Sequence, residues 1–123
     1  MKLSLPKDSA MQSTDFTYGV ATSSFQLEGA AEQRLPCIWD PFCNTPDKIK
    51  DQSTGLVACE HIERWQEDLD LIDSLNVDAY RFSISWPRVM QENGTLNQGG
   101  VNFYLQILDR LKEKNIKAYV TLY

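Results

Sequence analysis

The stretch from 78 to 86, DAYRFSISW, sets one guanidinium on an otherwise small and polar face of a predicted strand. Aromatic and aliphatic residues alternate there with small ones, and a period of two is the signature of a strand with two different faces. The small face carries Ala79, Arg81, Ser83 and Ser85. A guanidinium offers a planar set of donors that fits a carboxylate, so Arg81 could hold an anion in position. The alternative is a structural ion pair with a local acid such as Asp40 or Asp78.

The residues that could bind a metal are three cysteines and one histidine: Cys37, Cys43, Cys59 and His61. Cys59 and His61 are two positions apart, but Cys43 lies sixteen residues before Cys59, unlike the paired spacing of a zinc site. We therefore expect no metal and no cofactor. An odd number of cysteines, with no long apolar segment in the first fifteen residues, favours reduced thiols and a cytoplasmic protein.

The composition argues against several classes of partner. The 123 residues carry a formal net charge of −5 and a pI of about 4.7. Because they include no cluster of Lys and Arg, we expect neither nucleic acid nor an anionic membrane as a partner. No apolar run approaches the roughly 20 residues that a membrane-spanning helix needs. Hydrophobic residues make up 42% of the chain and charged residues 24%, which is typical of a globular domain with one core.

Hydrophobic periodicity divides the chain into alternating strands and helices. We predict a first strand within residues 16–28, a long loop over 29–57, a helix over 58–75, a second strand from 79, a helix over 101–114 and a third strand over 117–123. Both helices rest on apolar residues spaced three and four apart, from Ile62 to Leu75 and from Val101 to Leu111. We expect residues 1–15 to form a mobile N-terminal extension and residues 16–123 to form the folded part.

Two similar pentapeptides indicate a tandem α/β arrangement. NVDAY at 76–80 and NIKAY at 115–119 each follow a predicted helix and lead into a strand, as repeated helix-strand units would. Such crossovers give a parallel sheet, either an open doubly wound sheet or part of a (β/α)8 barrel. No Gly-rich nucleotide-binding motif follows a strand. A strand that is apolar on one face only favours the barrel, with Arg81 pointing inward.

Five ordered segments resemble the opening of family 1 glycoside hydrolases, the β-glucosidase family. They are FTYGVATSSFQLEGA, IWDPF, TGLVACEH, VDAYRFSISWPRV and VTLY, between Phe16 and Tyr123. The resemblance implies an α/β fold, the N-terminal β-α-β-α-β segment of a (β/α)8 barrel with about three of its eight strands. It also implies a retaining β-glycosidase, in which one carboxyl group is the acid/base and another is the nucleophile.

The resemblance assigns roles to two side chains. Gln26 matches a glutamine that binds sugar hydroxyls, which suits an amide with two donors and an acceptor. Arg81 matches the arginine beside the nucleophile, which it would hold ionised. The acid/base and the nucleophile are implied on later strands, in motifs of the Asn-Glu-Pro and Glu-Asn-Gly type, so we expect neither motif here. A lone carboxylate such as Glu28 cannot supply both roles, and the 123 residues alone are expected to be inactive.

Three interpretations remain open for a chain with three of eight strands. It is part of a β-glucosidase, one chain of a split glycosidase, or a non-catalytic small α/β binding protein. The first two predict a β-glucoside or oligosaccharide as substrate and the missing barrel portion as partner, and open sheet edges also allow self-association. Trp39, Phe42 and Trp86 could line a sugar site, but we expect hydrophobic packing for all three.

Overall fold

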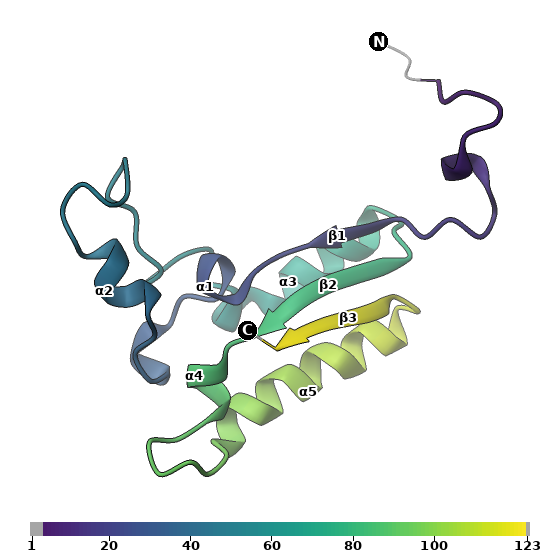
Figure 1. Ribbon diagram of the computed structural model, residues 1–123. Coiled ribbons are helices and arrows are strands. Elements are labelled where there is room, and N and C mark those ends of the chain that lie inside the picture. The colour runs from purple at the N-terminus through teal and green to yellow at the C-terminus, as the bar shows by residue number, and fades with distance from the viewer. Residues whose placement is uncertain (1–3, 123) are drawn as a thin grey trace.

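The computed structural model describes residues 4–122, in which strands and long helices alternate (Figure 1). The strands are β1 (Gly19–Ala21), β2 (Ala79–Ile84) and β3 (Lys117–Leu122), and the long helices are α3 (His61–Ser74) and α5 (Gln98–Glu113). Short helical turns fill the connections: η1 (Ala10–Gln12), α1 (Ser24–Leu27), η2 (Ala31–Gln33), α2 (Trp39–Cys43) and α4 (Trp86–Val89). The predicted order of strands and long helices is confirmed, and the predicted loop over 29–57 contains two short helical turns.

The three strands form one parallel sheet in the order β1-β2-β3. Parallel neighbours need crossover connections, which here contain α3 and α5, and both helices lie against the same face of the sheet (Figure 1). The first strand is shorter than predicted, because only Gly19–Ala21 pair with β2. Phe16 and Tyr18 lie before it, exposed, with their ring centroids 4.8 Å apart.

The hydrophobic core lies between the sheet and the two long helices. It consists of Leu69, Ile72, Tyr80, Phe82, Val89, Tyr104, Ile107, Leu111 and Ile116. The ring of Phe82 stacks on Tyr80 at 5.3 Å and on Tyr104 at 6.4 Å between centroids. Arg81 lies between Tyr80 and Phe82 in β2 and is exposed, whereas both aromatic side chains belong to the core. The predicted assignment of these residues to opposite faces of the strand is therefore confirmed.

The ends of the long helices follow from local backbone chemistry. α3 begins later than predicted because Glu60, just before it, has a φ of 56°, whereas α5 begins earlier because the Asn97 side chain accepts a hydrogen bond from Gly99 N–H. After the two helices, Asn76 and Asn115 adopt φ values of 54° and 57°. Asparagine tolerates this left-handed conformation, so the two similar pentapeptides begin with the same turn.

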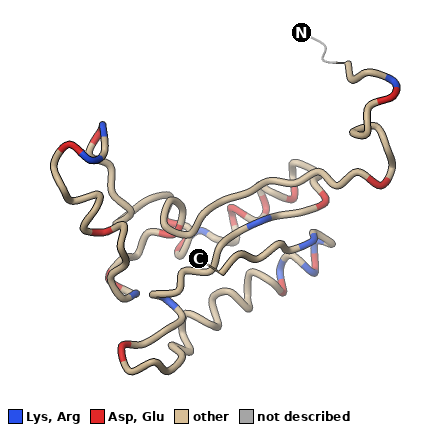
Figure 2. The backbone as a smooth tube through the Cα atoms, viewed as in Figure 1, with Lys and Arg blue, Asp and Glu red and all other residues tan. Residues whose placement is uncertain are grey.

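Charged residues lie along α3 and at the C-terminal end of α5 (Figure 2). Asp70 on α3 pairs with Arg110 on α5 at 3.0 Å and with Lys114, directly after α5, at 2.8 Å. Lys114 also pairs with Asp73 at 2.9 Å. Exposed ion pairs of this kind contribute little to stability, so core packing holds the two helices together. Across residues 4–122, no helix combines the length and apolar character needed to span a membrane.

One ion pair organises the segment between β1 and α3. Arg34 donates two hydrogen bonds to the Asp40 carboxylate, at 2.8 and 2.7 Å, and Cys37 N–H donates a third at 2.7 Å. The Arg34 guanidinium also lies over the Phe25 ring, 5.7 Å from its centroid. The hydrogen bonds from Arg34, supported by Cys37 N–H, lower the pKa of Asp40 to about 2 from its ordinary 3.8.

Adjacent glycines at the start of α5 should respond in opposite ways to alanine. A Cβ at Gly100 would lie 2.1 Å from the Arg88 carbonyl oxygen, whereas a Cβ at Gly99 would meet only Asn97 Oδ1 at 3.4 Å. We expect Gly100→Ala to lower the free energy of unfolding by about 1–3 kcal/mol, as overpacking does. Gly99→Ala should leave it equal or raise it by up to about 1 kcal/mol. Urea unfolding followed by circular dichroism compares the two; equal losses would contradict the close approach of α4 and α5.

The Arg34–Asp40 pair should make stability depend on acid pH. Because the pKa of Asp40 is lower in the folded state, its contribution is present above about pH 3.8 and is lost as pH falls toward 2. After allowance for solvent screening, we expect Asp40→Asn to lower the free energy of unfolding by about 1 kcal/mol at pH 6. The difference between the parent and the variant should be mostly lost at pH 2 and should vanish as pH falls below that value. A difference in melting temperature that stays constant from pH 6 to 2 would show that the charge of Asp40 is irrelevant.

Candidate active site

A cavity of about 900 Å³ opens at the carboxyl ends of β1 and β2. Its wall comes from the residues that follow β1, from the end of β2, and from the segment between α1 and α3. In α/β proteins with parallel strands, this end of the sheet is where ligands bind. The cavity is therefore the candidate active site.

Gln26 lies on α1, directly after β1, and is one of the residues that line the cavity. It is exposed, and within residues 4–122 the structure gives its side-chain amide no hydrogen-bond partner. The start of α1 is attached to the sheet, because Ser24 N–H donates to Ser83 Oγ at 2.8 Å and Ser83 Oγ donates to Ser24 Oγ at 3.1 Å. The amide is thus presented to the cavity from a turn fixed on β2.

Arg81 lines the same cavity from β2 and is exposed. Neither local acid that the sequence offered as a partner pairs with it. Asp40 accepts hydrogen bonds from Arg34, and Asp78 accepts one from Tyr18 N–H at 2.8 Å. The structure therefore brings Gln26 and Arg81, far apart in the sequence, to one cavity, and records no ion pair of Arg81 in the part of the chain that it describes.

Glu28 also borders the cavity, but it is only 4% exposed. One carboxylate oxygen accepts from Arg88 Nε at 2.9 Å and the other accepts from the Tyr104 hydroxyl. Burial, together with the adjacent Glu28 carboxylate, raises the pKa of Tyr104 above its usual range, so the hydroxyl stays a donor. Because both carboxylate oxygens accept hydrogen bonds from buried side chains, Glu28 has a structural role. No local sequence pattern indicates these partners, because they lie sixty and more residues away along the chain.

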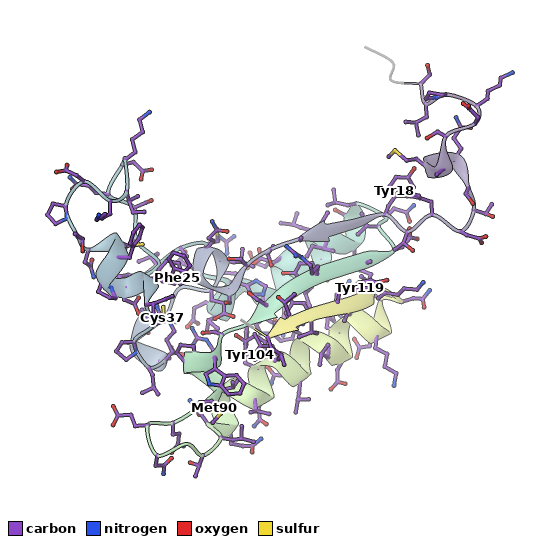
Figure 3. The ribbon with its side chains drawn as sticks, in the orientation of Figure 1. Tyr18, Phe25, Cys37, Met90, Tyr104 and Tyr119 are labelled. Carbon is purple, nitrogen blue, oxygen red and sulfur yellow. The ribbon has the colours of Figure 1, made fainter. Side chains whose placement is uncertain are left out.

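Aromatic side chains form part of the cavity wall. The ring of Trp39 lies near two other rings of this wall. Its centroid is 6.3 Å from that of Phe25 and 6.0 Å from that of Phe42. Figure 3 shows Phe25 beside the segment that carries Cys37. Trp39 and Phe42 contact each other, but they and Trp86 remain 42%, 41% and 53% exposed. The expected hydrophobic packing of all three is therefore incomplete, because they border the cavity and are not part of the hydrophobic core.

The fold places His61 apart from the three cysteines that were the other candidate metal ligands. Cys37, Cys43 and Cys59 are free thiols that line the cavity. His61 instead is buried at the start of α3, with Nδ1 2.6 Å from Asp68 Oδ2. Among residues 4–122, no three His, Cys, Asp or Glu side chains gather in an arrangement suited to a metal ion.

The letters Glu-Asn-Gly do occur, at 92–94, which corrects the expectation that the chain contains no such motif. Glu92 is exposed in a turn between Met90 and Leu96, which form an isolated antiparallel bridge. It borders a second cavity that contains neither Gln26 nor Arg81. Because α4 separates this turn from the end of β2, Glu92 does not lie at the carboxyl end of a strand, where the catalytic residues of such barrels are found.

Comparison with known proteins identifies this arrangement. The model of glycosyl hydrolase family 1 matches residues 9–123. The β-glucosidase of an Agrobacterium species is 49% identical over 112 residues, and β-glucosidase A of Thermotoga maritima is 50% identical over 111 residues. These matches cover 89% and 88% of this chain but 24% and 25% of the relatives, so the chain spans about a quarter of their length.

Solved structures agree with the sequence comparison. The family 1 β-glucosidase from Exiguobacterium antarcticum has a TM-score of 0.85 and 47% identity, with 90% of this chain and 25% of that chain covered. The T. maritima β-glucosidase in complex with castanospermine has a TM-score of 0.84 and 48% identity, with 90% and 26% covered. The predicted barrel segment of three parallel strands is confirmed. The chain belongs to glycosyl hydrolase family 1, of which it represents the N-terminal portion.

Proposed function

We propose that this chain supplies the glycone-binding glutamine and the nucleophile-supporting arginine of a retaining β-glycosidase of the β-glucosidase type. The observation that carries the proposal is the convergence of Gln26 and Arg81 on one cavity at the carboxyl ends of β1 and β2. Neither side chain is engaged by a hydrogen bond or ion pair within the described residues 4–122. Relatives named β-glucosidases support the substrate class, a β-glucoside or a related oligosaccharide.

The chemistry of the two side chains fits separate parts of the reaction. The Gln26 amide can donate to one sugar hydroxyl and accept from another. The Arg81 guanidinium would stabilise the ionised form of a carboxylate that attacks the anomeric carbon. The acid/base and the nucleophile themselves would come from the rest of the barrel, since a retaining mechanism needs two carboxyl groups about 5–5.5 Å apart.

The partner that this proposal requires is the rest of the barrel. Tyr119, Val120 and Leu122 on the edge strand β3 are 53%, 39% and 70% exposed. A parallel sheet is normally covered on both faces, and a further strand along β3 would satisfy its free backbone groups. Whether that strand is joined to this chain covalently or is supplied by a separate chain does not change the proposed roles.

The first test joins this chain to the segment of T. maritima β-glucosidase A that follows the matched region. The chimera should hydrolyse an aryl β-glucoside with retention, and the 123-residue chain alone should not exceed the buffer rate, because it lacks both carboxyl groups. General acid–base help alone is worth about 10²- to 10⁴-fold. A colorimetric assay, with proton NMR of the first-formed anomer, gives both readouts. Turnover by the pure 123-residue chain that survives Gln26→Ala would contradict the assignment.

The second test separates the roles of Gln26 and Arg81 in that chimera. Removing a cation raises the pKa of a nearby nucleophile, so Arg81→Met should shift the acidic limb of the pH–rate profile to higher pH and lower kcat about tenfold or more. Gln26→Ala should lower kcat/KM while leaving the acidic limb in place, because the amide carries no charge. If Arg81→Met lowers only the melting temperature and leaves the acidic limb unmoved, Arg81 has a structural role.

A further inference from the structure

A buried polar network joins three elements behind the cavity. Glu28, at the end of α1, accepts hydrogen bonds from Arg88 on α4 and Tyr104 on α5. Arg88 Nη2 also donates to the Gly29 carbonyl at 3.0 Å, and the Tyr104 hydroxyl accepts from Ser85 N–H at 2.8 Å. Figure 3 shows Tyr104 projecting from α5 toward the end of the sheet. We call Glu28, Arg88 and Tyr104 the buried network.

The buried network is too enclosed to act on a substrate directly. The Arg88 and Glu28 side chains are 3% and 6% exposed, and Tyr104 is 3% exposed. A buried ion pair is weak evidence for stability, because well-packed apolar residues often serve as well. The positions in which the network holds the elements around it are therefore more informative about its role than its contribution to stability.

That geometry concerns the short helix that carries Gln26. A single turn of four residues has no stability of its own, so contacts at its two ends must determine where Gln26 lies. Ser24 attaches the beginning of α1 to Ser83 on β2, and Glu28 attaches its end to α4 and α5. Gln26 lies between these two attachments.

The chain after Glu28 also has little freedom. Gly29 has a φ of 66°, and a Cβ there would lie 2.0 Å from the Val57 carbonyl oxygen. The carbonyl oxygens of Leu27 and Glu28 accept from Cys59 N–H and Ile62 N–H, both at 3.1 Å. Of these contacts, the buried network is the one that links α1 to the segment after β2. β2 is the strand that carries Arg81.

We propose that Glu28, Arg88 and Tyr104 form a positioning unit that fixes Gln26 relative to Arg81 across the cavity. What Gln26 binds is taken from the proposed function, on which this part of the inference rests. The coupling of α1 to the buried network is independent of it, because it comes from the hydrogen bonds of Glu28. Glu28 is then a positioning residue, and its loss should disturb sugar binding through Gln26 rather than remove a reacting group.

The first measurement is amide hydrogen exchange on the 123-residue chain itself. Glu28→Gln and the milder Tyr104→Phe should raise the exchange of the amides of 26–28, which bond to Ser23 and Ser24 carbonyls, about tenfold or more relative to amides of α5. The control is Ile72→Val, a core change on α3 outside the network. Ile72→Val should raise the exchange rate only of those amides that exchange through global unfolding of the chain. Equal increases along α1 and α5 in the network variants would overturn the proposal.

The second measurement is a double-mutant cycle on kcat/KM in the chimera. Glu28→Gln should lower kcat/KM about tenfold when Gln26 is present and less than about twofold in the Gln26→Ala background, because the two changes act through one contact. Ile72→Val should leave kcat/KM unchanged. Equal losses in both backgrounds would show that Glu28 does not act through Gln26. An inactive parent chimera would instead refute the proposed function, and the exchange measurement would then decide the positioning role alone.

Discussion

The central strand β2 is the constraint on which the rest of the structure depends. It is hydrogen-bonded to β1 on one side and to β3 on the other, and its two faces differ in chemistry. Tyr80 and Phe82 are 1% and 4% exposed under the helices. A shift of one residue would place these rings in the cavity and Arg81 in the core. The burial of two aromatic rings therefore determines which side chains face the cavity.

A second constraint acts on the segment after β1, because the short helix α1 contributes no residue to the hydrophobic core. α1 has four residues, and none of them is buried. Its place is set by polar contacts to Ser83 at one end and to Arg88 and Tyr104 at the other. Buried polar groups must be paired, so the carboxylate of Glu28 can occupy this position only with both partners in place. The same requirement gives Gln26, two residues earlier, a defined position at the cavity.

The rim of the cavity is built differently from its floor. The floor belongs to strands and to turns bonded to them, whereas the rim belongs to the connection that Arg34 and Asp40 hold together. Aromatic residues on this rim are two-fifths or more exposed. Loops on a rigid scaffold are where related enzymes vary without loss of the fold. The division therefore separates the side chains proposed to bind the sugar, on the floor, from the exposed aromatic side chains of the rim.

The sequence by itself determined the order of the elements, the faces of β2 and the family, because these depend on local periodicity and on short ordered segments. Alternation in residues 79–84 identified the core face, and the Asn residues at 76 and 115 marked both helix ends. Only the tertiary structure decided the partners of charged groups. Asp40 pairs with Arg34 rather than Arg81, and Glu28 pairs with residues sixty or more positions away. The letters Glu-Asn-Gly at 92–94 fall in an exposed turn. Side-chain pairing of this kind depends on which elements pack together, and no local pattern records it.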